Sequence, residues 1–114
     1  MPPMSMPTHD EGTTPEETVE GFLEALRSGR ILDALDVFSM KAVIRDPRGR
    51  EHRGIREIVN YVNRLPRTLE IEELRRDGDA VMAIVRSGRD DRARHTYALN
   101  RGRIQALRIE GMRS

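Results

Sequence analysis

Residues 42–49 read AVIRDPRG, and this short stretch decides both the fold and the candidate site. Its start is β-branched and too short for a helix, so we predict a strand over residues 42–46. The segment Asp-Pro-x-Gly then matches a type I turn, in which aspartate caps the turn, proline presets the second position and glycine takes the fourth. Asp46 therefore ends a strand, where it either serves the turn alone or also faces an enclosed pocket.

Amphipathic segments on both sides of this stretch predict three helices. The sequence TPEE at residues 14–17 combines a threonine cap, a proline at the first helical position and a glutamate three residues after the cap, which is a capping box. The first helix should begin there and end at Gly29. A second, short helix is expected over residues 31–38, and a third over residues 55–65, where Pro66 stops it.

After the third helix the apolar pattern changes to that of strands. Turn signals lie at Asp77-Gly78, at residues 88–91 and at residues 100–102. They divide this part of the chain into four strands, which predicts an antiparallel meander. The expected strand over residues 80–86 is apolar at odd and even positions alike, so both faces of the sheet should be covered there. The helices can cover one face. A second copy of the chain would cover the other, which predicts a homodimer through the outer sheet face.

Length and composition narrow the class of protein. The 114 residues suit one domain over residues 14–114, after a leader at residues 1–13 that we expect to be disordered. Charged residues make up 34% of the chain, yet the net charge is only +1, and arginines alternate with acids, so we expect no nucleic-acid partner. No apolar run approaches the ~20 residues of a membrane span. The absence of cysteine excludes a disulfide framework and fits a cytoplasmic protein.

Three parts of the sequence together carry a resemblance to a known family: Gly29, the strand-end segment 42–47 with Gly54 to Ile58 after it, and the closing segment 102–105. With the element order, they resemble the nuclear transport factor 2-like superfamily, which includes SnoaL-like polyketide cyclases and ketosteroid isomerases. The resemblance implies an α+β fold, in which a cone-shaped, curved antiparallel sheet wraps around three N-terminal helices. It also implies a deep pocket between helices and sheet.

In the ketosteroid isomerases that this chain resembles, the aspartate of the strand-end Asp-Pro pair moves a proton between carbons, and it falls on Asp46. That chemistry needs a sheltered carboxylate with a raised pKa and donors for the developing oxyanion. The position of the family's donor tyrosine matches Phe22, which offers no hydrogen bond. The late-strand donor falls at about His95, and Tyr97 lies two residues on, on the same strand face. Efficient steroid isomerisation is therefore not expected.

The candidate catalytic residues are thus Asp46, His95 and Tyr97. The residues expected to contact a ligand are Phe22, Phe38, Ile44, Val62 and Leu99. His95 and Tyr97 can equally be core residues with satisfied hydrogen bonds, and His52, in a polar loop, is expected to be exposed. Three scattered histidines do not make a metal site, and no cofactor is expected.

Two functions of different class follow. One is a cofactor-free isomerase- or cyclase-like enzyme in which Asp46 is the general acid or base on a small apolar carbonyl compound. The other is a non-catalytic dimeric module that binds a small apolar molecule or a protein partner, with Asp46 confined to its turn.

Overall fold

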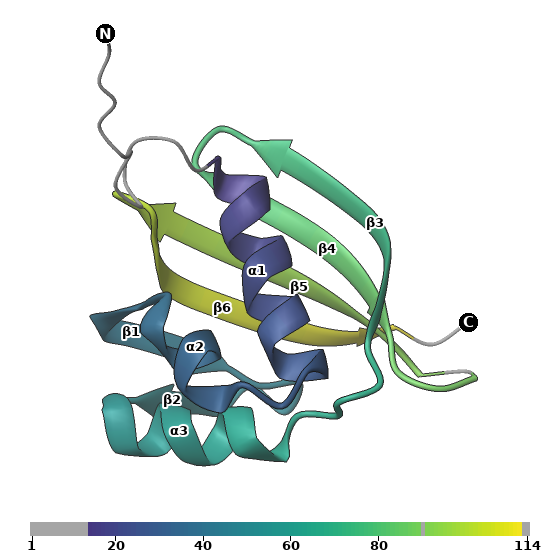
Figure 1. Cartoon of the computed structure of the whole chain (residues 1–114), viewed down its shortest axis with the longest axis horizontal. Coiled ribbons are helices and arrows are strands. Elements are labelled where there is room, and N and C mark those ends of the chain that lie inside the picture. Colours follow the sequence, from purple (N-terminus) through teal and green to yellow (C-terminus); the bar gives the residue numbers. More distant parts are fainter. Residues whose placement is uncertain (1–13, 90, 113–114) are drawn as a thin grey trace, which may run out of the picture.

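The computed structural model describes residues 14–89 and 91–112, so the leader predicted for residues 1–13 lies outside the described residues. Three helices and six strands follow one another along the chain (Figure 1). Their order is α1 (Pro15–Arg27), α2 (Ile31–Asp36), β1 (Phe38–Arg45), β2 (Glu51–Arg53), α3 (Ile55–Arg64), β3 (Glu70–Asp77), β4 (Ala80–Arg86), β5 (Arg92–Asn100) and β6 (Arg103–Met112). The predicted α+β class is confirmed.

The strands form one open sheet in the order β2-β1-β6-β5-β4-β3. The predicted meander is confirmed as β3 to β6, whose neighbours all pair antiparallel. The sheet as a whole is mixed, because β1 pairs parallel with β6. Parallel neighbours need a long connection, and here the chain from β2 to β5 provides it. The last strand of the meander, β6, then lies beside β1.

The first helix begins and ends where the sequence predicts. Thr14 accepts a hydrogen bond from the backbone N–H of Glu17, and the Glu17 side chain accepts one from the N–H of Thr14, which completes the capping box. Gly29 follows the helix with a φ of 74°, in the left-handed region that glycine adopts without strain. The second helix is shorter than predicted and ends at Asp36. Phe38 instead opens β1, paired with Ile104 of β6.

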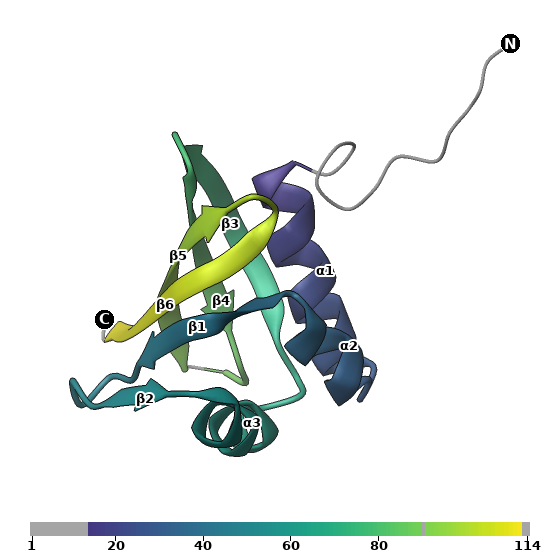
Figure 2. The same ribbon diagram turned by 90° about the vertical axis from the view of Figure 1, so that its left-hand side faces the viewer.

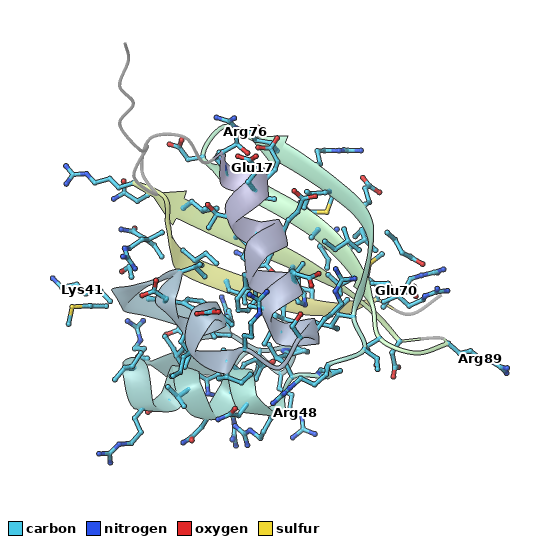
Figure 3. The ribbon with its side chains drawn as sticks, in the orientation of Figure 1. Glu17, Lys41, Arg48, Glu70, Arg76 and Arg89 are labelled. Atoms are coloured by element: carbon cyan, nitrogen blue, oxygen red, sulfur yellow. The ribbon has the colours of Figure 1, made fainter. Side chains whose placement is uncertain are left out.

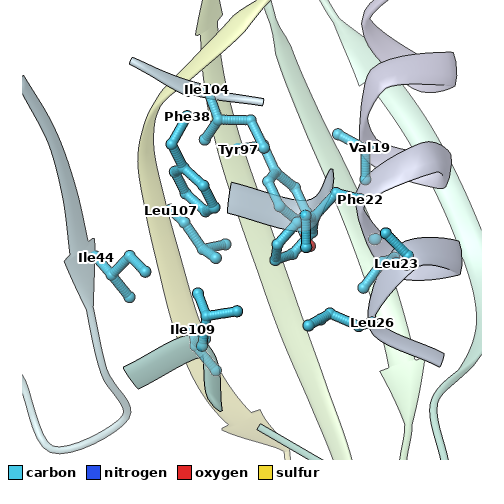
Figure 4. Packing of buried hydrophobic residues seen from close by; sticks show 14 of the residues in the cluster. Val19, Phe22, Leu23, Leu26, Phe38, Ile44, Tyr97, Ile104, Leu107 and Ile109 are labelled. Atoms are coloured by element: carbon cyan, nitrogen blue, oxygen red, sulfur yellow. The ribbon is translucent and has the colours of Figure 1, made fainter. Parts of the chain in front are cut away.

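The hydrophobic core lies between the helices and the inner face of the sheet. Figure 4 shows Tyr97 of β5 pointing toward Phe22 of α1, with Phe38 beside them. The rings of Phe22 and Phe38 pack edge to face with centroids 5.3 Å apart, and those of Phe22 and Tyr97 are 6.1 Å apart. Each fully buried side chain of this size contributes about 1.5–3 kcal/mol, so this cluster anchors α1 on the sheet.

All three helices lie on one side of the sheet (Figure 2). The strand β4 shows the consequence: Val81, Ala83 and Val85 are buried on the helix side, whereas Met82 and Ile84 on the other side are only half-buried. No helix of the described chain covers this second face. The doubly apolar strand predicted from the sequence therefore has one covered face and one open face in the single chain.

Charged side chains are spread around the whole outline of the molecule. In Figure 3 Lys41, Arg48 and Arg89 point outward in three different directions. Within residues 14–89 and 91–112, no helix is both long enough and apolar enough to cross a membrane.

Candidate functional site

Asp46 closes the turn that the sequence predicts. Its backbone carbonyl accepts a hydrogen bond from the N–H of Gly49 at 2.9 Å. Its side-chain Oδ1 accepts two more, from the backbone N–H groups of Arg48 at 2.9 Å and Arg50 at 3.0 Å. The turn role of Asp46 is thus fully formed, and it orients the carboxylate toward the rest of the hairpin.

The second carboxylate oxygen of Asp46 meets His52. The His52 Nε2 atom lies 3.0 Å from Asp46 Oδ2, and because an ionised carboxylate has no proton to give, the imidazole N–H is the donor. The His52 ring also lies against Tyr61 of α3, with ring centroids 4.6 Å apart. The expectation that His52 is exposed was wrong: its side chain is only 16% exposed. It is on β2, opposite Ile44, and that short strand was not predicted.

These contacts set the protonation state of the acid. The hydrogen bond from His52 lowers the pKa of Asp46, and the two backbone N–H groups of the turn lower it further against the opposing effect of burial. Burial raises the pKa of Tyr61, and the charge of Asp46 raises it further, whereas Arg64 lowers it. Asp46 is therefore ionised at neutral pH and weakly basic, which is the opposite of the raised pKa that a general base needs.

His95 and Tyr97 form a second polar pair, deep inside the molecule. The Nδ1 atom of His95 lies 2.8 Å from the Tyr97 hydroxyl, and both side chains are buried. Burial lowers the pKa of His95 to about 4, so the imidazole is neutral at pH 7. Burial also raises the pKa of Tyr97, which keeps its hydroxyl protonated. The predicted shared strand face of the two residues is confirmed.

A cavity of about 270 Å³ opens beside His95. It lies between the end of α3, the chain that follows α3, and the strands β4 to β6. Its lining is mainly apolar, and it consists of Pro47, Tyr61, Arg64, Leu65, Pro66, Leu69, Val85, Ser87, Ala93, His95 and Ile109. Because Nδ1 of His95 is engaged by Tyr97, Nε2 is the ring nitrogen left for a ligand; no described residue hydrogen-bonds it.

The predicted site residues are distributed unevenly around this cavity. His95 lines it, and Asp46 is the neighbour of the lining residue Pro47; Asp46 itself borders a separate depression of about 240 Å³ with Arg45 and Arg108. The predicted ligand-contacting residues are all buried in the core cluster: Phe22, Phe38, Ile44, Val62 and Leu99. None of them lines the cavity beside His95. Their contact with a ligand remains a prediction.

Sequence reasoning missed most of the apolar lining. Tyr61, Leu65 and Leu69 come from the end of α3 and the chain after it, and Ala93 and Ile109 from strands far along the sequence. Pro66 was a visible signal for the end of the helix. Nothing local indicates that this end faces β5.

Solved structures with the same fold are numerous. They include an NTF2-like protein of unknown function from Cytophaga hutchinsonii, with a TM-score of 0.74 and 19% identity over 88% of this chain and 91% of that one. A candidate polyketide cyclase from Sinorhizobium meliloti aligns with a TM-score of 0.72 and 20% identity over 82% and 94% of the two chains. A candidate ketosteroid isomerase from Kribbella flavida aligns with a TM-score of 0.74 and 11% identity, over 88% of this chain and 78% of that one. At these identities the likeness concerns the fold alone.

Among curated protein sequences, none matches this chain. The family model of the SnoaL-like domain does match, over residues 19–109, which runs from the core of α1 to the inner face of β6. Since this match spans most of the sequence and agrees with the fold, the chain belongs to the SnoaL-like domain family.

Proposed function

We propose that the protein binds a small apolar molecule in the cavity of about 270 Å³, and that His95 gives the ligand its one buried hydrogen bond. The observation that carries this proposal is the state of His95: it lines the cavity, it is buried, and one ring nitrogen has no partner among the described residues. This nitrogen is not closed off from solvent, and a ligand with a hydroxyl or carbonyl oxygen would supply its hydrogen bond inside a mainly apolar cavity.

The cavity suits a small ligand. Its volume is near the lower end of ligand pockets, and at ~30 Å³ per water molecule it corresponds to roughly nine waters. A ligand of roughly ten non-hydrogen atoms would fill it. Leu69, Val85 and Ile109 offer its body an apolar surface. Because His95 is neutral, it can either donate to the ligand or accept from it, according to tautomer.

The test compares 2-phenylethanol with ethylbenzene, which has the same apolar body and no hydroxyl. We expect the alcohol to bind more tightly, with NMR amide shifts concentrated at Val85, Ala93 and Ile109. The control is His95→Leu combined with Tyr97→Phe, which removes both partners of the buried hydrogen bond and keeps the interior apolar. In that variant the two ligands should bind equally. Equal binding to the unmodified chain, or shifts centred elsewhere, would contradict the proposal.

Proton transfer by Asp46 is the second candidate function. It is supported by the position of Asp46, whose side chain is 12% exposed and whose neighbour Pro47 lines the cavity. The family also has fold relatives described as cyclases and isomerases. Against it stands the lowered pKa of Asp46, which makes the carboxylate a weak base. Any activity on a small ketone should therefore be slow.

The assay for this second function follows conversion of 3-cyclohexenone to 2-cyclohexenone, which requires removal of one proton from carbon and return of another. Asp46→Asn should abolish turnover and leave the circular dichroism spectrum unchanged. His52→Gln should instead raise the pKa of Asp46 and shift the pH profile upward. Turnover that survives Asp46→Asn would exclude Asp46 as the base.

A homodimer through the outer sheet face is also proposed. Support comes from the half-buried Met82 and Ile84, with Thr96 beside them on β5, on a face that no helix of the described chain covers. A second copy would bury these side chains and would leave the cavity, on the other side of the sheet, accessible. Sedimentation equilibrium of the full chain should give twice the mass of one chain; a monomer at all concentrations would exclude this dimer.

A further inference from the structure

Arg64 is the only residue with a permanent charge among those that line the cavity. It is the last residue of α3 and is exposed at its rim. No carboxylate belongs to the lining, and among the described residues Arg64 has no ion-pair or hydrogen-bond partner. The cavity therefore presents a positive charge at its rim and a neutral, mostly apolar interior. A neutral ligand would make no use of that charge.

Tyr61 stands beside this cation. It lies one helical turn before Arg64, at the i, i+3 spacing that places two side chains on one helix face, and both line the cavity. The charge of Arg64 lowers the pKa of Tyr61, whereas burial and the charge of Asp46 raise it more strongly. No described residue forms a hydrogen bond with that hydroxyl. A guanidinium and a phenolic hydroxyl on one face can together hold one carboxylate, through charge-assisted hydrogen bonds.

The charge of Asp46 also acts on the Tyr61 hydroxyl, but the carboxylate of Asp46 is held by other groups. Its Oδ1 accepts from the turn backbone and its Oδ2 accepts from His52, and it does not line the cavity. His95 and Ser87, the other polar lining residues, belong to the sheet: His95 is on β5 and Ser87 follows β4. The polar lining residues thus come from two separate parts of the fold, the end of α3 and the sheet.

We infer that the natural ligand is a small monocarboxylic acid with an apolar body, whose carboxylate binds Arg64 and Tyr61 at the rim while its body lies against Leu69, Val85 and Ile109. This inference rests on the proposed function, because it assigns a ligand class to the same cavity. An aryl or branched aliphatic acid of roughly ten non-hydrogen atoms has the required size. A second oxygen on the body of the acid would reach His95.

The test uses the full chain with phenylacetate and with 2-phenylethanol, which share a body and differ in charge. Titration calorimetry at low salt should show phenylacetate binding about tenfold more tightly, and the advantage should shrink as salt is added. Arg64→Gln should remove that advantage, so that phenylacetate binds no more tightly than 2-phenylethanol. Arg64→Lys should restore part of it. The matched control is Arg56→Gln, at the start of the same helix and outside the cavity, which changes the net charge equally and should have no effect.

Each other outcome has a defined meaning. If phenylacetate and 2-phenylethanol bind equally, the carboxylate assignment is overturned while the proposed function stands. If Arg56→Gln weakens phenylacetate as much as Arg64→Gln does, the effect is general attraction and the rim site is overturned. If neither molecule binds, the assignment and the proposed function fail together.

Discussion

Asp46 and His52 face each other across the hairpin of β1 and β2, with Oδ2 of the aspartate 3.0 Å from Nε2 of the histidine. The Asp46 carboxylate thus links the turn backbone to the imidazole of His52, and that ring packs against Tyr61. The acid that the sequence marks as a possible base is therefore a structural member of the hairpin, and its low basicity follows from the same contacts that hold the hairpin together.

Asp46→Asn should destabilise the protein at neutral pH, with a melting temperature lower by a few degrees. The folded pKa of Asp46 is lowered from 3.8, so its contribution is present above that value and is lost as the pH falls through the folded pKa. The difference between the variant and the unmodified chain should then shrink at pH 3, as measured by urea unfolding. Asp79→Asn, at an exposed turn position with no hydrogen bond from its side chain to a described residue, is the control and should change little.

The buried pair of His95 and Tyr97 should show strong energetic coupling. Tyr97→Phe leaves Nδ1 of His95 without its partner, and His95→Leu leaves the Tyr97 hydroxyl buried without one. Each single change should cost about 1–3 kcal/mol of unfolding free energy, while the double variant should cost clearly less than the sum. A double-mutant cycle by chemical denaturation measures the difference. Strict additivity would mean that the hydrogen bond contributes nothing to stability.

His95 should also make stability depend on pH in a defined window. Burial lowers its folded pKa from 6.5 to about 4, so between these values the unfolded chain binds the proton and the folded chain does not. Stability is therefore greatest above pH 6.5 and falls by about 3 kcal/mol on the way down to pH 4. His95→Asn keeps a hydrogen-bonding side chain that does not titrate, and it should flatten this part of the curve. A His95 NMR resonance that titrates near pH 6.5 would contradict the expectation.

The parts of the fold that could be predicted depend on signals within a few residues. The capping box of α1 is complete within four residues and specifies a backbone conformation directly. The Asp77-Gly78 signal marks the hairpin between β3 and β4, although Asp77 still pairs with Ala80, so the two turn residues are Gly78 and Asp79, one position later than predicted. Pro66 likewise stops α3 because it cannot continue a helix. For such elements the sequence contains the whole cause, and the structure agrees with it.

The parts that could not be predicted depend on distant partners. Strand β2 is three polar residues, Glu51–Arg53, with no apolar alternation, and it exists because β1 offers its edge. His52 is sheltered because α3 brings Tyr61 against its ring. The cavity is lined by residues at the end of α3 together with His95 and Ile109, which are far apart in the sequence. No local sequence pattern predicts that these segments lie together.

The outer face of the sheet yields a prediction that a single substitution can decide. Ile84 is half-buried at the middle of β4, and its register neighbour on β5 is Arg94, whose side chain pairs with Glu110. If a second copy covers this face, Ile84→Glu places a new charge in a closed interface and should convert the dimer to a monomer in sedimentation velocity, with the fold retained. Met40→Glu is the matched control, because Met40 lies on β1 and is 93% exposed. This substitution adds the same charge at a different place on the sheet. Because both variants add the same charge, loss of the dimer in the Ile84 variant alone would locate the interface on this face. A dimer unaffected by Ile84→Glu would require another surface, and the open face of β4 would then be covered by something other than a second copy.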